Sequence, residues 1–443
     1  MNDTIAAIST AFGEGAIAII RLSGPGAVVI ADAVFQARKK PSELPNRVQQ
    51  FGAIFSSERK LDDVLLSVHR APHSYTGEDV VEINCHGGVL VTRRILELLL
   101  SKGARSAEPG EFTQRAYLGG KMDLTQAEAV MDLISAQTDL ALRAATEQLE
   151  GRLGDRIRAL KEAVLEVLAH VEAHIDFPDE DIDPETGAAL LEKLDALSAE
   201  TEALLATATQ GKILREGVRT VIYGAPNVGK SSLLNRLLGY ERAIVSARPG
   251  TTRDVIEEVI NLQGIPLRLV DTAGIRESLD EVECEGMERT RRQLDRADLV
   301  LHVVDASTAA PSAVLPEDPR MLTVLNKADL GEHESWGVIE GVRISCLDER
   351  GLEQLDKAIV NRITGGKGAG RDWSVAINAR HKACLEITLH FTDAAREAMR
   401  AGLSPEFVAE ELRSALEAVG NVVGRADAED VLGHIFATFC IGK

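Results

Sequence analysis

The stretch "GAPNVGKSS", Gly224 to Ser232, decides how the middle of this chain folds. Its first eight residues fit the pattern G-x-x-x-x-G-K-S, with the apolar stretch "TVIY" before it and "SSLLNRLLG" after it. A strand, a glycine-rich loop and a helix in this order surround phosphate oxygens with backbone N–H groups. The pattern predicts that Lys230 reaches the β- and γ-phosphates of a nucleotide and that the Ser231 hydroxyl binds Mg²⁺.

Further elements of a nucleotide site follow in chain order. "PGTTRD" contains Thr252, a candidate hydroxyl ligand for Mg²⁺ and the γ-phosphate. "LRLVDTAG" reads as a strand that ends at Asp271, a candidate metal carboxylate. Its Gly274 can donate a backbone N–H to the γ-phosphate, and Thr272 and Ala273 lie between the two.

The base of the nucleotide is indicated by "VLNKAD", which places Asn326, Lys327 and Asp329 at the end of a strand. A carboxylate there accepts two hydrogen bonds from guanine N1–H and N2–H₂, which adenine does not offer. "ISC" places Ser345 and Cys346 where backbone donors would complete the base pocket. The ordered set predicts a guanine-nucleotide domain.

The residue after "DTAG" is Ile275, where many GTPases have a Gln that orients the attacking water. Another group must therefore position the water or neutralise charge. Asn227 could bind a monovalent cation, or it could only shape the phosphate loop. Glu283, in "LDEVECEG", could orient water, or it could belong to a solvated loop.

The composition bounds the remaining possibilities. The 443 residues suggest roughly two to four domains. The net charge of −20 argues against a broad surface that coats nucleic acid, although a local basic patch remains compatible with it. Five scattered cysteines fit a reducing cytoplasm, and no apolar run is long enough to span a membrane.

The spacing of apolar residues along the chain predicts several domains. Short apolar runs such as "AIAIIRLSG" and "VLLSVH" predict strands before residue 119, and "VVIADAVF" and "VTRRILELLL" predict helices. Helical spacing follows, with Thr125 and Glu128 as a possible capping box, and a further helical pattern runs over about 188–214. Helices return over 378–439. These patterns predict an α/β domain inserted into a helical domain.

Stretches outside the phosphate-loop motifs are also distinctive, namely "SYTGEDVVEINCHGG", "PGEFTQRAYLGGKMDLTQAEAV", "DFPDEDID", "LLREG", "DTAGIRE" and the terminal "FCIGK". With these stretches the chain resembles the MnmE (TrmE) family of tRNA-modifying GTPases over its whole length. The resemblance implies a folate-binding-like α+β domain over 1–119, which also dimerises. It further implies a discontinuous helical domain over 120–215 and 368–443 and an inserted Ras-like P-loop GTPase domain over 216–367.

The resemblance also implies an activity. The family modifies C5 of the wobble uridine in certain tRNAs, adding aminomethyl or carboxymethylaminomethyl groups. It acts as a homodimer, in a heterotetramer with a flavin-containing partner, MnmG (GidA), so FAD enters only through that partner. The carbon source is a tetrahydrofolate in its 5,10-methylene or 5-formyl form, and GTP hydrolysis is stimulated by potassium.

Residue roles carry over by position. The phosphate loop is Asn227, Val228, Gly229, Lys230, Ser231 and Ser232, with Mg²⁺ at Ser231 and Thr252. Glu283 matches the family's water-orienting glutamate. The implied potassium ligands are Asn227, Ser246, Arg248 and Thr251, of which Arg248 can contribute only its backbone carbonyl.

The folate site falls to Arg21, Glu82, Lys121 and Lys443. Pterin presents an N–H and an NH₂ side by side, so that Glu82 could accept both. The tail "FCIGK" would bring Cys440 and Lys443 to this site, with Gly442 allowing close approach of the backbone. Whether Cys440 reacts or only packs there stays open.

A competing function shares every nucleotide motif: a GTPase switch in ribosome assembly. Such a switch would need no folate pocket, so the N-terminal block favours tRNA modification.

Overall fold

The computed structural model describes most of the chain. The described residues are 3–176, 184–239, 243–244, 258–270, 292–310, 318–337, 339–366, 373, 375–424 and 429–443. By its internal contacts the chain separates into two compact units. One unit comprises residues 1–131, 149–162 and 416–443, and the other comprises residues 132–148 and 163–415.

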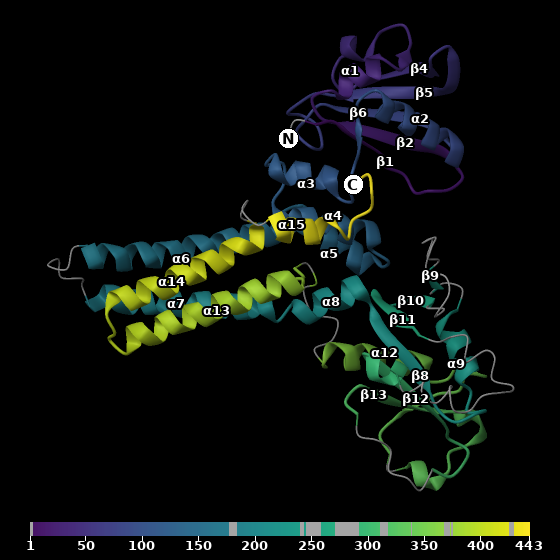
Figure 1. Cartoon of the computed structure of the whole chain (residues 1–443). Helices are drawn as coiled ribbons and strands as arrows, with labels where there is room; N and C mark the ends of the chain where they lie inside the picture. The colour runs from purple at the N-terminus through teal and green to yellow at the C-terminus, as the bar shows by residue number, and fades with distance from the viewer. Residues whose placement is uncertain are drawn as a thin grey trace. The chain divides into compact units, whose positions relative to one another are not determined.

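The N-terminal part is a mixed sheet whose strands run in the order β3-β4-β5-β6-β2-β1-β7 (Figure 1). Alternate residues of β2 and β6 pack with α1 and α2 into one core, so both helices cover the same face. The other face carries polar side chains at the centre of the sheet, among them Arg21 and Glu82. The elements are β1 (Ile5–Ile8), β2 (Gly15–Ser23), α1 (Ala27–Asp32), β3 (Phe35–Gln36), β4 (Gln49–Ser56), β5 (Arg59–His69), β6 (Val80–Gly87), α2 (Val89–Ser101), β7 (Arg105–Ser106) and α3 (Glu111–Leu118).

The C-terminal tail joins this N-terminal domain. Ile441 forms an antiparallel bridge with Pro109, and the N–H of Phe112 donates to the carbonyl of Lys443 at 3.1 Å. A Cβ at Gly442 would lie 2.5 Å from the carbonyl oxygen of Ile8, so only glycine fits this approach. The tail therefore packs on the N-terminal domain, and its part in a folate site stays a prediction.

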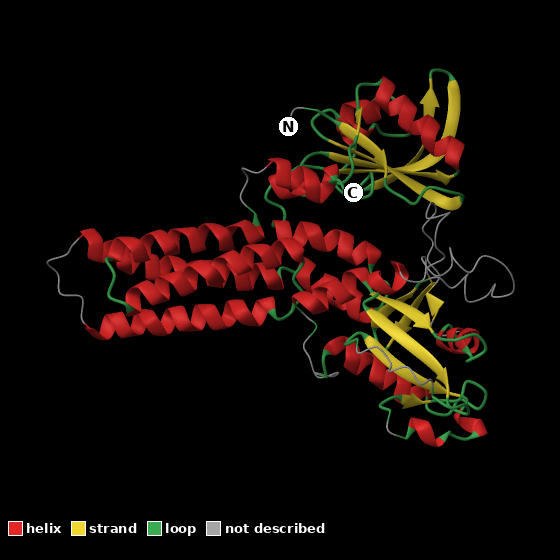
Figure 2. Cartoon of the chain, turned by 60° about the horizontal axis from the view of Figure 1, so that its bottom comes forward, coloured by secondary structure: helices red, strands yellow, loops and turns green. Residues whose placement is uncertain are grey.

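Long helices, drawn in red in Figure 2, make up much of the second unit. α7 and α13 pack along their length, and the Asp195 carboxylate pairs with Arg396 and Arg400. Among the described residues none of the helices combines the length and apolar character needed to cross a bilayer. The helices are α4 (Leu124–Ser135), α5 (Asp139–Leu149), α6 (Arg152–Asp176), α7 (Pro184–Leu205), α8 (Ala208–Glu216), α13 (Ala379–Arg400), α14 (Pro405–Val423) and α15 (Glu429–Phe436).

The second sheet has the order β14-β13-β12-β8-β11-β10-β9. Its first five strands are parallel, and β10 and β9 are antiparallel to their neighbours. Leucines of α9 and α12 cover one face. The elements are β8 (Val218–Tyr223), α9 (Lys230–Leu237), β9 (Ala243–Ile244), β10 (Glu258–Leu262), β11 (Ile265–Leu269), β12 (Leu299–Asp305), β13 (Met321–Asn326), β14 (Val342–Arg343) and α12 (Leu352–Thr364).

Three local predictions are wrong. The capping box of α4 is Asp123 with Gln126, not Thr125 with Glu128, because Asp123 Oδ1 accepts from the Gln126 N–H and Gln126 Oε1 accepts from the Asp123 N–H. Helix α1 ends at Asp32, because Phe35 pairs with β4. The helical pattern over 188–214 forms two helices, α7 and α8. They separate at Thr207, whose N–H donates to the carbonyl of Leu204, three residues back, where an α-helix would use the residue four back.

Candidate functional site

The phosphate loop is built by backbone conformations that few residues adopt. Gly224 follows β8 at φ 154°, and a Cβ there would lie 2.2 Å from the Val303 carbonyl oxygen. Asn227 has φ 63° and Gly229, at the start of α9, has φ 98°. Asn enters this left-handed region more readily than other side-chain-bearing residues. The spacing of the motif is therefore required by the loop itself.

Lys230 lies at the first position of α9 and points back over the loop. Its Nζ donates to the carbonyls of Gly224 at 3.0 Å and Ala225 at 2.8 Å. Burial lowers the pKa of Lys230, because a desolvated ammonium is disfavoured. The negative charge of a phosphate would offset that cost, so the side chain is held where an anion stabilises it.

The base-recognition motif meets the phosphate loop through Asn326. This buried side chain donates from Nδ2 to the Val228 carbonyl at 2.9 Å and accepts the N–H of Cys346 at Oδ1 at 3.2 Å. A Cβ on Gly229 would lie 2.1 Å from its Nδ2. Asn326 therefore ties three predicted segments of the site together.

The neighbours of Asn326 have different roles. Lys327, at φ 64°, donates to Asp305 at 2.6 Å, and Asp329 lies in the short 3-10 helix Ala328–Leu330. The Ser345 N–H donates to the Arg350 carbonyl. Because the N–H groups of Ser345 and Cys346 both donate within the protein, either would have to share its proton to reach a base.

Sequence reasoning missed two contributors to this site. Asp305 ends β12 and pairs with Lys327, and hydrogen bonds from Lys327 and Ser307 hold the pKa of its carboxyl below the usual value although burial alone would raise it. Arg236 donates to the Cys346 carbonyl at 2.9 Å. The position of Asp305 at the carboxyl end of a parallel strand was the available signal.

Nine of the predicted site residues lie outside the described residues. They are Ser246, Arg248, Thr251, Thr252, Asp271, Thr272, Ala273, Gly274 and Glu283. Of the predicted metal ligands, only Ser231 and Asn227 are described. Within the described residues no group of three His, Cys, Asp or Glu side chains is arranged to hold a metal ion.

A second cluster lies on the open face of the N-terminal sheet. Arg21 of β2 donates from Nε and Nη2 to Glu82 Oε1 of β6 at 3.0 and 2.8 Å. The guanidinium stands 5.6 Å from the Tyr75 ring centroid and 5.7 Å from that of Phe112, which places it in the range of cation–π attraction. Arg21 is therefore held by an ion pair and two aromatic rings.

The other two predicted folate residues border this cluster. Lys121 donates to the Pro72 carbonyl at 3.0 Å, in the loop that also carries Tyr75. Lys443 bonds the backbone of Phe112. His69, which sequence reasoning missed, lies 3.9 Å from Glu82 Oε2. Arg21 and Glu82 are therefore paired directly, whereas Lys443 meets Phe112 through the backbone and Lys121 contacts the loop at Pro72.

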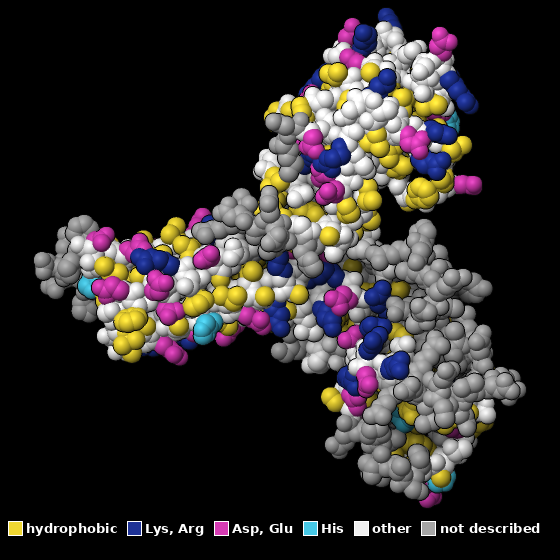
Figure 3. Space-filling view, in the orientation of Figure 1, with side chains coloured by type: hydrophobic (Ala, Val, Ile, Leu, Met, Phe, Trp, Pro, Cys, Tyr) yellow, Lys and Arg dark blue, Asp and Glu magenta, His cyan; other side chains and the backbone are white. Residues whose placement is uncertain are grey.

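Cationic and anionic side chains are interspersed over the helices on the face drawn in Figure 3. No continuous basic surface covers the described helices in that view. This agrees with the net charge of −20.

Known protein families and relatives match this chain over almost its whole length. Residues 4–121 match the family model described as GTP-binding protein TrmE N-terminus, and residues 124–440 match that of the MnmE helical domain. The chain is 51% identical over 445 residues to the tRNA modification GTPase MnmE of Akkermansia muciniphila, which covers 99% of each. It is 46% identical to that of Alkaliphilus metalliredigens, over all of both chains. It is 47% identical to that of Geobacillus thermodenitrificans, over 100% of this chain and 99% of the relative.

Among solved structures, the G domain of the T. maritima FeoB iron transporter matches 33% of this chain and 98% of its own, at 26% identity. The TM-score of 0.22 is too low to support a structural argument.

Proposed function

Because this chain belongs to the MnmE family of tRNA modification GTPases, we propose that it hydrolyses GTP to drive modification of C5 of the wobble uridine in certain tRNAs. The observation that carries the nucleotide part is the junction at Asn326. There the base motif is hydrogen-bonded to the phosphate loop through Val228. A guanine recognised by Asp329 and phosphates held by Lys230 therefore belong to one site.

Each residue of the proposed site has a distinct role in binding or hydrolysing GTP. Lys230 and the N–H groups of the loop bind the phosphates, and Asp329 accepts from guanine. Mg²⁺ would be held by Ser231 and Thr252, with Asp271 nearby, and would neutralise charge on the phosphates. The Ser231 hydroxyl, in the first turn of α9, fits that assignment. Thr272, Ala273 and Gly274 would face the γ-phosphate, and Glu283 would orient the attacking water.

A potassium ion is proposed beside the phosphates, held by Asn227, Ser246, Thr251 and the carbonyl of Arg248. It would supply the positive charge that other GTPases obtain from an arginine finger. The left-handed backbone at Asn227 gives a separate reason for an Asn, because that conformation suits Asn with or without a cation. The two reasons can be separated by experiment.

Replacing Asn227 with Gly tests the cation role. Glycine keeps the left-handed conformation and removes the side-chain oxygen. We expect the wild-type rate of GTP hydrolysis to rise when sodium is replaced by potassium, and we expect Asn227→Gly to lose this rise while still binding GDP. If the variant keeps the potassium stimulation, Asn227 only shapes the loop. Equal wild-type rates in the two salts would remove the proposed cation altogether.

We also propose that the cluster around Arg21 and Glu82 binds a tetrahydrofolate, in its 5,10-methylene or 5-formyl form, as the one-carbon donor. Oε1 of Glu82 accepts from Arg21, but a carboxylate has about four lone-pair sites and can accept the pterin as well. Lys121 and Lys443 suit the carbonyls and the glutamate tail of the cofactor. Two aromatic rings beside a fixed cation are consistent with a flat ligand.

The folate proposal predicts that Glu82→Ala weakens tetrahydrofolate binding in calorimetry by about tenfold or more, the cost of a charge-assisted hydrogen bond. Asp62→Ala is the matched control, because Asp62 pairs with the exposed His86 on the same sheet. Equal affinities of wild type and Glu82→Ala would exclude Glu82 from the site, and no binding by wild type would exclude the folate.

The partners are proposed from the family. A homodimer would join a flavin-containing MnmG (GidA) protein in a heterotetramer, with tRNA as substrate and FAD bound only by the partner. Support from this chain is indirect: its acidic surface favours a partner that supplies contacts to tRNA.

A further inference from the structure

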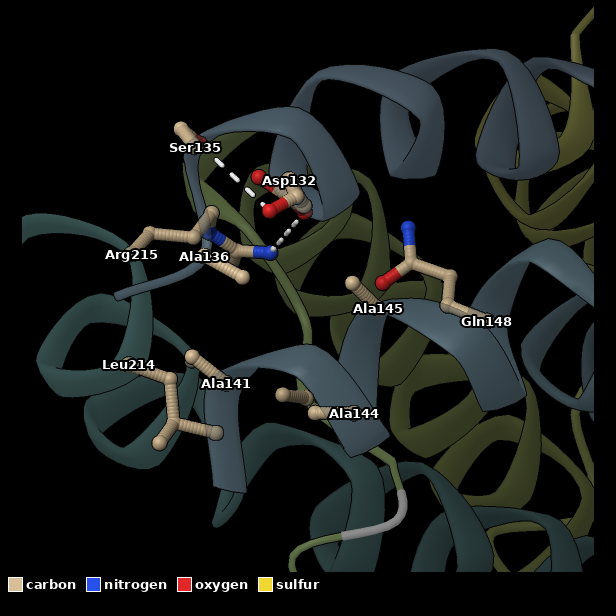
Figure 4. Close-up of a pocket in the computed structure, with 11 residues that line it drawn as sticks. Asp132, Ser135, Ala136, Ala141, Ala144, Ala145, Gln148, Leu214 and Arg215 are labelled. Carbon is tan, nitrogen blue, oxygen red and sulfur yellow. Dashed lines mark hydrogen bonds and ion pairs between the residues drawn. The ribbon is translucent and has the colours of Figure 1, made fainter. Parts of the chain in front are cut away.

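The chain leaves the helices for the second sheet after α8 and returns to the helices before α13, and Arg215 contacts both connections. Arg215 lies in the last turn of α8, directly before β8. Its Nη1 donates to Asp132 Oδ2 of α4 at 3.1 Å (Figure 4). Its Nη2 donates to the carbonyl of Ile377, which lies just before α13. One guanidinium therefore holds the entering segment, the returning segment and α4.

The two crossing segments also meet backbone to backbone. A Cβ on Gly211, one turn before Arg215 on α8, would lie 2.2 Å from the Ile377 carbonyl oxygen. No side chain fits there. We call this meeting of α8 with the returning segment the Arg215 joint. The two segments have little freedom to slide past each other without breaking contacts of the backbone itself.

Helix α5 completes this joint with small side chains. Ala141 and Ala144 pack against Leu214 of α8 and Ala376 of the returning segment. A cavity of about 20 Å³ remains beside them, lined by alanines, Gln148 and the Asp132–Arg215 pair, which is room for about one water molecule. Figure 4 shows how closely these elements approach.

Leu140, at the start of α5, extends from the joint to the second sheet. A Cβ on Gly264 would lie 2.4 Å from Leu140 Cδ1 and 2.7 Å from its Cγ, so the leucine side chain covers the backbone at this glycine. Gly264 and Gln263 form the turn between β10 and β11, and both have positive φ. The tip of this hairpin therefore rests on α5.

The hairpin connects the two segments that the sequence assigns to the γ-phosphate. β10 begins six residues after Thr252, and β11 ends two residues before Asp271. Its strands pair without interruption from Glu258↔Leu269 to Leu262↔Ile265. A displacement of the tip would be carried along both strands to these segments.

We propose that Leu140 is a positioning residue for GTP hydrolysis, held in place by the Arg215 joint. It acts through the β10–β11 hairpin on the γ-phosphate segments and makes no contact with the nucleotide. This inference rests on the proposed GTPase function. Because GDP lacks the γ-phosphate, the contact should affect turnover and leave GDP binding unchanged.

The test compares Leu140→Ala with Leu142→Ala in the full chain, since Leu142 lies on the same helix with 45% of its surface exposed. We expect kcat of Leu140→Ala to fall about tenfold, because a small misplacement of reacting groups is costly. KM for GTP, GDP affinity and all values of Leu142→Ala should stay within about twofold of wild type. Hydrogen exchange at the turn 262–265 should speed up only in Leu140→Ala.

Arg215→Lys provides a second variant that keeps the charge. A lysine cannot reproduce the fork that reaches both Asp132 and the Ile377 carbonyl, so the same loss of kcat is expected. Lys212→Ala is its control, because Lys212 is exposed on the same helix. Wild-type kcat in Leu140→Ala or in Arg215→Lys would overturn the inference. A wild-type chain without GTPase activity would instead overturn the proposed function.

Discussion

Asp329 is the residue on which recognition of the base depends in the proposed nucleotide site. It lies in the short 3-10 helix after β13, beside Lys327, whose ammonium is already paired with Asp305. A carboxylate at this place matches the two adjacent donors on the edge of guanine. Changing only its chemistry should therefore change which base is bound and leave the phosphate contacts intact.

We predict that Asp329→Asn weakens GTP binding by about tenfold to hundredfold, because hydrogen bonds to a charged group are lost. Xanthosine triphosphate carries a carbonyl where guanine has its amino group, so it should gain affinity from the amide. Competition for a fluorescent nucleotide measures both effects. Asp318→Asn, three residues before the first residue of β13, should bind like wild type. If Asp329→Asn keeps its preference for GTP, Asp329 does not read the base.

Residues of the phosphate loop could be predicted because their spacing is fixed by local backbone geometry, as Gly224 and Gly229 show. The pairing of Lys327 with Asp305 could not, since those residues come from neighbouring strands that only the folded sheet brings together. The aromatic pair around Arg21 was missed for the same reason, because Tyr75 and Phe112 are distant in sequence.

At the scale of elements, helix α3 is held to the start of the chain by a buried ion network. Arg115 is 2% exposed and pairs with Asp3, Glu78 and Glu111. Burial alone would raise the pKa of Glu111, but hydrogen bonds from Arg105, the Glu108 N–H and Arg115 lower it. The pKa of Asp3 is lowered chiefly by Arg105.

We predict that Arg115→Met destabilises the N-terminal domain by about 3–5 kcal/mol, because Glu111 is left buried with fewer partners. Hydrogen exchange on β2 and β6 measures this loss. Lys60→Met, at an exposed ion pair, should cost less than about 1 kcal/mol. In wild type these carboxyl groups stabilise the fold fully above their ordinary pKa values of 4.5 for Glu111 and 3.8 for Asp3, and this stability is lost as the pH falls through their lowered pKa values. A loss below 1 kcal/mol in Arg115→Met would contradict this role.

Element types were predictable from periodicity, and their ends were less so. The strand "AIAIIRLSG" and the helix "VTRRILELLL" are confirmed as β2 and α2. The end of α1 was wrong because Phe35 packs over Gly52 in the sheet, a long-range contact that local spacing does not encode. The predicted cap of α4 was wrong because two capping patterns overlap there, and the structure uses Asp123 with Gln126.

At the scale of the whole molecule, we propose two sites in one chain: a nucleotide site on the second sheet and a folate site at the cluster of Arg21 and Glu82 on the first. The multi-domain fold class is confirmed, with the TrmE-type N-terminal domain, the helical domain and the GTPase domain all present. The predicted boundaries at residues 119, 215 and 367 stay predictions. A GTPase switch in ribosome assembly would use only the first of the two sites.

The most direct test of the account deletes the gene from the organism that carries it and analyses the tRNA nucleosides by mass spectrometry. The account predicts that the C5-modified wobble uridines disappear and return when the wild-type gene is restored, but not with Lys230→Ala, which removes the phosphate-binding ammonium. Unchanged wobble uridines in the deletion strain, together with defective ribosome assembly, would contradict the account and support the switch instead.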